Sequence, residues 1–204
     1  MYSNWSDIKT IDTHERKIGV FTMINKEIAL FAKDYYRMTG KEFKNSIYDN
    51  IQILIRHNLK YMWWWRHKDR KYLKFIAKVM LFRFSRKYGL EIGNAQIGAG
   101  IYLGHPYNIT INPSSIIGEN VNIHKGATIG AENRGKRKGA PRIGNNVYIG
   151  LNATIVGKIV IGDDVMIAPN SYINRDVPSH SIVIGNPAQI IARENATEGY
   201  VNFC

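Results

Sequence analysis

The amino-acid sequence predicts a mainly β fold, a parallel β-helix of about four coils that follows an α-helical N-terminal region. Three observations lead to this prediction. An aliphatic residue recurs every six residues through the second half of the chain. The residue after it is usually glycine or alanine, and a small or β-branched residue follows four positions on. The first 88 residues, in contrast, show the spacing of amphipathic helices.

The six-residue period distinguishes a β-helix from ordinary secondary structure. A helix repeats its buried face every 3.6 residues and a strand every 2, so neither alone gives six. A short strand followed by a tight corner does, and three such units close a triangular coil that stacks on the next. The twelve aliphatic positions, enough for four coils, are Ile97, Leu103, Ile109, Ile117, Ile123, Ile129, Ile143, Ile149, Ile155, Ile161, Ile167 and Ile173.

Two insertions interrupt this series. The smaller adds two residues between Ile109 and Ile117, and the larger adds eight between Ile129 and Ile143. The larger insertion, residues 131–142, is polar, basic and rich in glycine, so we expect it to loop out of the coil.

The region before the β-helix is expected to hold three helices. Apolar residues from Ile24 to Tyr35 follow helical spacing, and Gly40 fits a helix end. Ser46 with Asp49 three positions later resembles a capping box for a second helix. A third helix is predicted over residues 70–87. The expected domains are therefore an α-helical region, residues 1–88, and a β-helix with a C-terminal tail, residues 89–204.

Positive charge is concentrated in one segment of the chain. The net charge is +12, and residues 56–88 hold eleven Lys or Arg against one acidic residue, Asp69. The same segment contains three consecutive tryptophans, Trp63 to Trp65. We first expect this segment to pack against a neighbouring subunit. Binding to the face of an anionic membrane is the second interpretation, and binding to nucleic acid is a distant third.

The chain shows no feature of a secreted or membrane-spanning protein. The single cysteine, Cys204, has no partner within the chain, so an oxidising compartment is not required. No secretory signal is visible at the N-terminus, and no stretch approaches the ~20 apolar residues that cross a bilayer. We expect a cytoplasmic protein, with peripheral contact to the inner face of the membrane as the alternative.

Two histidines lie on the six-residue repeat and are the candidates for chemistry. A β-helix is a rigid scaffold, so functional residues are expected at its corners and in the inserted loop. His105 is the stronger candidate, because an irregular insertion follows it closely and clefts form at such places. His124 is the other. Only these two are on the repeat, which disfavours a zinc-dependent hydratase with three histidine ligands, and no metal is expected.

Several motifs together resemble a known family. Within Ile97–Ile191 these are IYLGH at 101–105, IGEN at 117–120, GATIG at 126–130, PRIG at 141–144 and GNPA at 185–188. In order and spacing they resemble the hexapeptide-repeat acyltransferases, specifically the serine acetyltransferase branch, which also includes enzymes that acetylate sugars of surface polysaccharides. The resemblance implies a left-handed β-helix, acetyl-CoA as co-substrate, and a homotrimer with its sites in grooves between neighbouring β-helices.

The resemblance also implies roles for particular residues. His105 takes the place of the general base that removes a proton from the acceptor hydroxyl, a task suited to imidazole. His124, Asn108 and Lys136 are candidates to line the acceptor groove. The residues expected to contact CoA are Gly150, Leu151, Pro169, Asn174, Arg175 and Arg193, whereas Gln189 stands where a basic residue is common.

Departures from the family pattern bear on the acceptor. Gly104 replaces an aspartate before the catalytic histidine, and Gly139 and Ala140 replace the arginine and histidine expected in the loop. Leu90 stands where an aspartate orients the imidazole, with Glu91 beside it as a weak substitute. These changes favour an uncharged hydroxyl, most simply that of a sugar. The alternatives are serine O-acetylation in cysteine biosynthesis and, less favoured, a non-catalytic scaffold.

Overall fold

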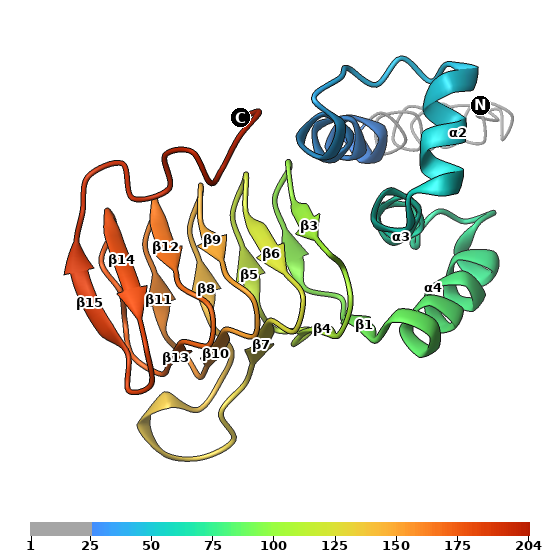
Figure 1. The fold of residues 1–204 in the computed structure, drawn as a ribbon. Helices are drawn as coiled ribbons and strands as arrows, with labels where there is room; N and C mark the ends of the chain where they lie inside the picture. Colours follow the sequence, from blue (N-terminus) through green and yellow to red (C-terminus); the bar gives the residue numbers. More distant parts are fainter. Residues whose placement is uncertain (1–25) are drawn as a thin grey trace, which may run out of the picture.

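The computed structural model describes residues 26–204, in which a group of helices lies at one end of a long β-helix (Figure 1). A first helix covers residues 26–39 of this described part. It is followed by α2 (Ile47–Ile55), α3 (His57–Arg66) and α4 (Lys74–Tyr88). Ile24, the first residue of the predicted helical pattern, lies outside the described residues.

The predicted helix boundaries are largely confirmed. Gly40 follows the first helix with a φ of 70°, and the side chain of Ser46 accepts from the backbone of Asp49 in a complete capping box. Gly89 ends α4 in the left-handed conformation. One helix was missed, because α3 begins directly after the extended residue Arg56 and has no side-chain cap.

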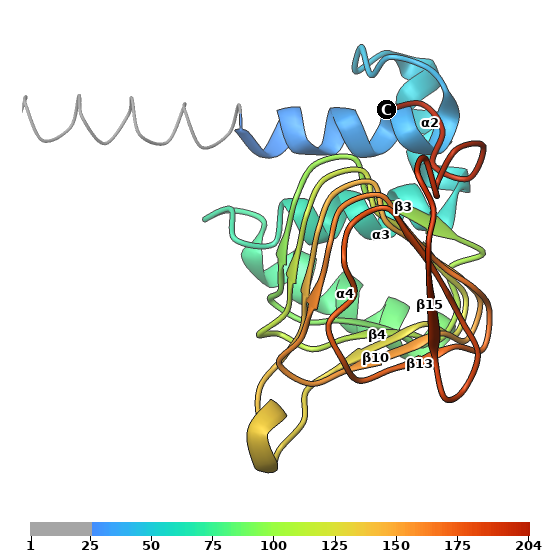
Figure 2. The ribbon, with the colours of Figure 1, turned by 90° about the vertical axis from the view of Figure 1, so that its left-hand side faces the viewer.

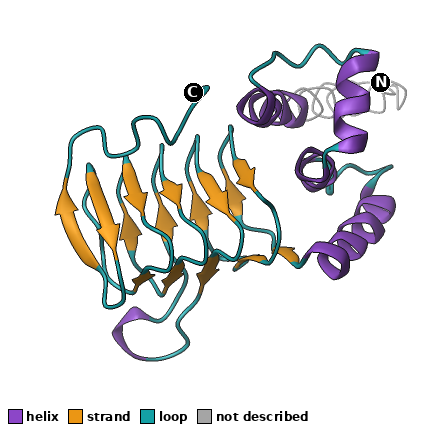
Figure 3. Cartoon of the chain, viewed as in Figure 1, coloured by secondary structure: helices purple, strands orange, loops and turns teal. Residues whose placement is uncertain are grey.

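The β-helix is built of three sheets, one on each side of a triangular coil (Figures 2 and 3). Sheet A contains β1 (Leu90–Ile92), β4 (Ile109–Ile111), β7 (Thr128–Gly130), β10 (Thr154–Val156) and β13 (Tyr172–Ile173). Sheet B contains β2 (Gln96–Ile97), β5 (Ile116–Ile117), β8 (Arg142–Ile143) and β11 (Val160–Ile161). Sheet C contains β3 (Tyr102–Gly104), β6 (Asn122–His124), β9 (Tyr148–Ile149), β12 (Val165–Ile167), β14 (Ser181–Ile184) and β15 (Gln189–Ala192).

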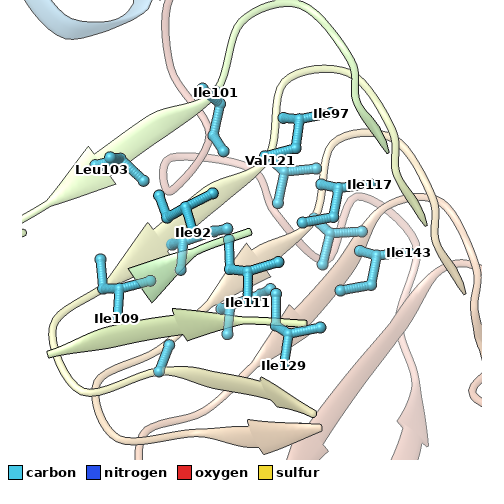
Figure 4. Close-up of a cluster of buried hydrophobic side chains, with 14 of the residues drawn as sticks. Ile92, Ile97, Ile101, Leu103, Ile109, Ile111, Ile117, Val121, Ile129 and Ile143 are labelled. Carbon is cyan, nitrogen blue, oxygen red and sulfur yellow. The ribbon is translucent and has the colours of Figure 1, made fainter. Parts of the chain in front are cut away.

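The six-residue series sets the register of these sheets. In sheet B, for example, Ile97 pairs with Ile117, and Ile117 with Ile143. The aliphatic side chains point into the coil and form one continuous core (Figure 4). Ile123, Ile129 and Ile149 are fully buried there. Parallel stacking therefore places each aliphatic side chain on the corresponding one of the coil before it.

The β-helix has about five coils rather than the four predicted. Sheet A begins with β1, which pairs with β4 before the six-residue series starts. At the other end β14 continues sheet C, and Val183 pairs with Ile167. The spacing from Ile92 to Ile97 and from Ile173 to Val183 breaks the six-residue phase. The ladder of hydrogen bonds continues although the sequence period is lost.

The two ends of the β-helix are closed in different ways. At the far end β15 turns back and pairs antiparallel with β14. At the near end a buried ion pair joins the first helix to α3, with Arg66 Nε 2.8 Å from Asp34 Oδ2. Asp34 also accepts from the backbone N–H groups of Gly100 and Ile101, at 3.0 Å each. The helices thus cap the first coil, which would otherwise expose its apolar interior.

Within residues 26–204, every helix is too short or too polar to cross a membrane.

Candidate active site

His105 lies at the corner where sheet C passes into sheet A. It follows β3 directly, its side chain is exposed, and its φ of 47° is in the left-handed region. Its backbone oxygen accepts from the N–H of Tyr107 at 2.7 Å, which closes a tight turn. Asn108 ends the turn with a φ of 54°, and its N–H donates to the oxygen of Tyr88. The corner is therefore held against the end of α4, with the imidazole free on the surface.

Later coils repeat this corner, and the corners stack into one edge of the prism. Lys125 N–H donates to Gly104 O, Asn152 N–H donates to Lys125 O, and Asn170 N–H donates to Leu151 O, at 2.9–3.0 Å. Asn152 and Asn170 have left-handed φ values of 57° and 60°. We call this edge, residues 105–108, 125–126, 150–152 and 168–170, the C–A edge. Asparagine tolerates the left-handed conformation, which explains its recurrence here.

The C–A edge gathers part of the predicted site. Gly150, Leu151 and Pro169 lie on the same edge as His105. A Cβ added to Gly150 would lie 2.7 Å from the backbone nitrogen of Pro169, so only glycine allows these two corners to pack so closely. The C–A edge therefore runs from Gly150, packed closely against Pro169, to the exposed candidate base His105.

His124 lies one coil beyond Gly104, with which it pairs in sheet C. Its ring is 4.8 Å from the ring of Tyr148 and 6.1 Å from that of Tyr102. Its Nε2 atom is buried and has no hydrogen-bond partner among the described residues. Burial, and to a lesser degree the charge of His105, lowers the pKa of His124. A neutral imidazole with an unpaired nitrogen therefore stands beside the candidate base.

The structure gives a reason for Gly104 that the sequence did not. A Cβ at this position would lie 2.5 Å from Cε1 and Nδ1 of His124. Glycine therefore makes room for the His124 ring, and an aspartate here would displace it. The absence of a side chain at position 104 and the position of the His124 ring therefore depend on each other.

Glu91 is not placed to orient His105 by direct contact. It lies on β1, where it pairs with Thr110 in sheet A, and its side chain is exposed. Among the described residues, no hydrogen bond or ion pair joins its carboxylate to the His105 imidazole. Glu91 instead lines a groove of about 480 Å³ between α4 and sheet A, with Phe82 and Asn112 on its walls. This groove could not be predicted from the sequence, because its two walls, α4 and sheet A, come together only in the folded chain.

The remaining predicted residues lie on other edges of the β-helix. Asn174 and Arg175 follow β13, where sheet A ends, and Arg175 Nη2 donates to Ala188 O at 2.6 Å. Arg193 follows β15, and its N–H donates to His180 O, at the start of the sheet C strands. The structure therefore does not gather Arg193 with Gly150 and Leu151 within one chain.

The inserted loop also projects from a different edge. It leaves sheet A after β7 and enters sheet B at β8, and it contains the short 3-10 helix η1 (Gly135–Arg137) with the exposed Lys136 (Figure 2). His105 and Lys136 thus belong to two corners of the same prism. Within residues 26–204, no cluster of three or more His, Cys, Asp or Glu side chains is arranged to hold a metal ion.

Comparison with known proteins supports the resemblance seen in the sequence. The model of the bacterial transferase hexapeptide (six repeats) family matches residues 140–175. Serine acetyltransferase from Helicobacter pylori is 34% identical over 151 residues, which cover 72% of this chain and 84% of that protein. Serine acetyltransferase 2 from Arabidopsis thaliana is 39% identical over 119 residues, which are 58% of this chain. The match spans only 37% of the length of the plant protein.

Solved structures show the same left-handed β-helix with helices before it. Neisseria gonorrhoeae serine acetyltransferase, in a crystal structure in complex with serine, has a TM-score of 0.68 and 28% sequence identity. The aligned region covers 82% of this chain and 70% of that one.

Proposed function

Since this chain belongs to the serine acetyltransferase branch of the hexapeptide-repeat acyltransferases, we propose that it transfers an acetyl group from acetyl-CoA to a hydroxyl oxygen. The observation that carries the proposal is the C–A edge. Along this edge lie the exposed imidazole of His105, the glycine Gly150, and the exposed residues Leu151 and Pro169. Such an edge offers a base beside a surface that a narrow, flexible pantetheine arm can approach closely.

In the proposed reaction, the neutral imidazole of His105 removes the proton of the acceptor hydroxyl. The oxygen attacks the thioester carbonyl, and the C–S bond of the resulting tetrahedral adduct breaks to release the CoA thiolate. The imidazolium then returns its proton to that sulfur, so the base is regenerated. Asn174, Arg175 and Arg193 remain predicted contacts for the polar end of CoA.

The acceptor we propose first is the hydroxyl of serine. Relatives named serine acetyltransferase, and a structure of one in complex with serine, support this acceptor over the sugar favoured by the sequence analysis. One observation favours instead an acceptor molecule that carries a hydroxyl but no charged groups, such as a sugar. Gly104 and His124 place a neutral ring where the family pattern has a carboxylate, and Ala140 replaces a loop histidine.

An acceptor panel tests the function directly. With acetyl-CoA present, release of the CoA thiol is expected to rise above its hydrolysis background when serine is added. Alanine is the matched compound without the hydroxyl and should give no increase. A response to hexoses but not to serine would move the acceptor to a sugar. If no acceptor increased release of the CoA thiol and acetyl-CoA gave no thermal shift, a non-catalytic scaffold would be the remaining interpretation.

We also propose that the chain acts as a homotrimer, because one copy does not complete the site. The base and the inserted loop lie on different edges of the β-helix, so His105 can meet a loop only from a neighbouring copy. Sedimentation should give a mass of about 70 kDa, three times the 23.3 kDa of the chain. A stable monomer at micromolar concentration would argue against the shared site.

A further inference from the structure

The basic, aromatic segment of the chain divides into a buried part and an exposed part. In α3, Tyr61, Met62 and Trp65 are buried against the first coil, and Trp65 Nε1 donates to Ile92 O at 3.2 Å. Arg66 is buried as well and is paired with Asp34. Packing therefore accounts for α3, including Trp65 near its C-terminal end. It does not account for α4.

One face of α4 exposes large apolar side chains. Phe75 is 80% exposed, Phe82 is 62% exposed and Val79 is 43% exposed. Tyr72, in the turn before the helix, is 87% exposed. Their spacing of three and four residues places them in one stripe. The opposite face, with Ala77 and Phe84, is the buried one. We call the stripe formed by Tyr72, Phe75, Val79 and Phe82 the α4 stripe.

Positive charges flank the α4 stripe on both sides. The exposed cations of α4 are Lys74, Lys78, Arg83, Arg86 and Lys87, and the helix contains no Asp or Glu. Arg86 lies 5.7 Å from the ring centre of Phe82, so the cationic and aromatic groups share one surface. Two copies of this face brought together would oppose like charges. The charge pattern therefore selects an anionic occupant that also accepts aromatic rings.

We propose that the α4 stripe and its flanking cations dock this protein on an anionic lipid surface. The helix would lie in the plane of the interface, with the rings of Phe75 and Phe82 at the level of the acyl boundary. Lysine and arginine side chains on either side would pair with lipid phosphates. A helix of 15 residues with cations around an aromatic stripe suits this geometry, whereas it is too short to span a bilayer.

Vesicle co-sedimentation of the full chain tests this docking independently of catalysis. Binding is expected to vesicles that contain phosphatidylglycerol and not to pure phosphatidylcholine, and it should weaken steeply as salt rises. In Lys74→Gln/Lys78→Gln, binding should fall by about fivefold for each charge removed. In Phe75→Ser/Phe82→Ser, it should fall at least as much, because both rings leave the interface.

Matched variants distinguish vesicle binding by the α4 stripe from nonspecific binding by exposed apolar or cationic side chains elsewhere. Val160→Ser changes a side chain that is 51% exposed on sheet B, and Lys136→Gln/Arg137→Gln removes two exposed cations of the inserted loop. Both are expected to bind vesicles like the wild type. Equal binding to neutral and anionic vesicles, no binding to either, or an equal loss in the control variants would overturn the proposal. So would a larger assembly that Phe75→Ser/Phe82→Ser dissociates, because a second copy would then occupy the stripe.

Discussion

Replacing His105 by alanine is expected to lower the rate of acetyl transfer by about 10²–10⁴-fold, the usual effect of losing a general base. The fold should survive, since the side chain is exposed and the corner is held by backbone hydrogen bonds. Affinity for CoA should change little, because His105 is at the end of the C–A edge, whereas the proposed CoA contacts Gly150, Leu151 and Pro169 lie further along it. The measurements are steady-state turnover, thermal unfolding and CoA binding on the purified oligomer.

Two further variants make this test specific. His105→Asn keeps a side chain that tolerates the left-handed φ of 47° and lacks a basic nitrogen, so it should lose activity like the alanine variant. His124→Ala should lose less, because that ring stands beside the proposed base and packs against Tyr148. Normal turnover in an intact His105→Ala trimer would contradict the mechanism. A comparable loss confined to His124→Ala would assign the base to His124.

Replacing Asp34 by alanine is expected to destabilise the protein by about 3–5 kcal/mol, the cost of leaving one partner of a buried ion pair uncompensated. Asp34 is fully buried, and the side chain of Arg66 is 3% exposed. The change would also remove the acceptor of the Gly100 and Ile101 N–H groups. The effect should appear in the free energy of unfolding from denaturant titration, provided that the transition remains two-state.

An exposed ion pair between the same helix and the β-helix provides the control. Lys33 lies 3.6 Å from Glu119, and their side chains are 64% and 55% exposed. Lys33→Ala should therefore change the free energy of unfolding by about 1 kcal/mol or less. If Asp34→Ala changed stability no more than Lys33→Ala, the buried pair would not be what holds the helices on the first coil.

The repeating part of this protein could be predicted from its amino-acid sequence. The six-residue series gave the coils, the direction of the side chains and the position of the inserted loop, because each strand takes its register from the strand one coil earlier. Local signals were equally sufficient for the capping box at Ser46 and for the end of α4 at Gly89. Each of these signals lies within a few residues of the structure it specifies. The position of His105 at a corner follows from the same local pattern.

Contacts between segments that are far apart in the sequence became visible only in the folded chain. Gly104 is explained by His124, twenty residues later, and Asp34 is satisfied by Arg66, thirty-two residues later. The sequence could not divide the basic segment into a buried α3 and an exposed α4, because both carry aromatic and cationic residues at helical spacing. The predicted CoA contacts follow strands of different sheets, which the order of these residues in the sequence does not show. These relations depend on how coils and helices pack, and local periodicity carries no information about contacts between segments far apart in the chain.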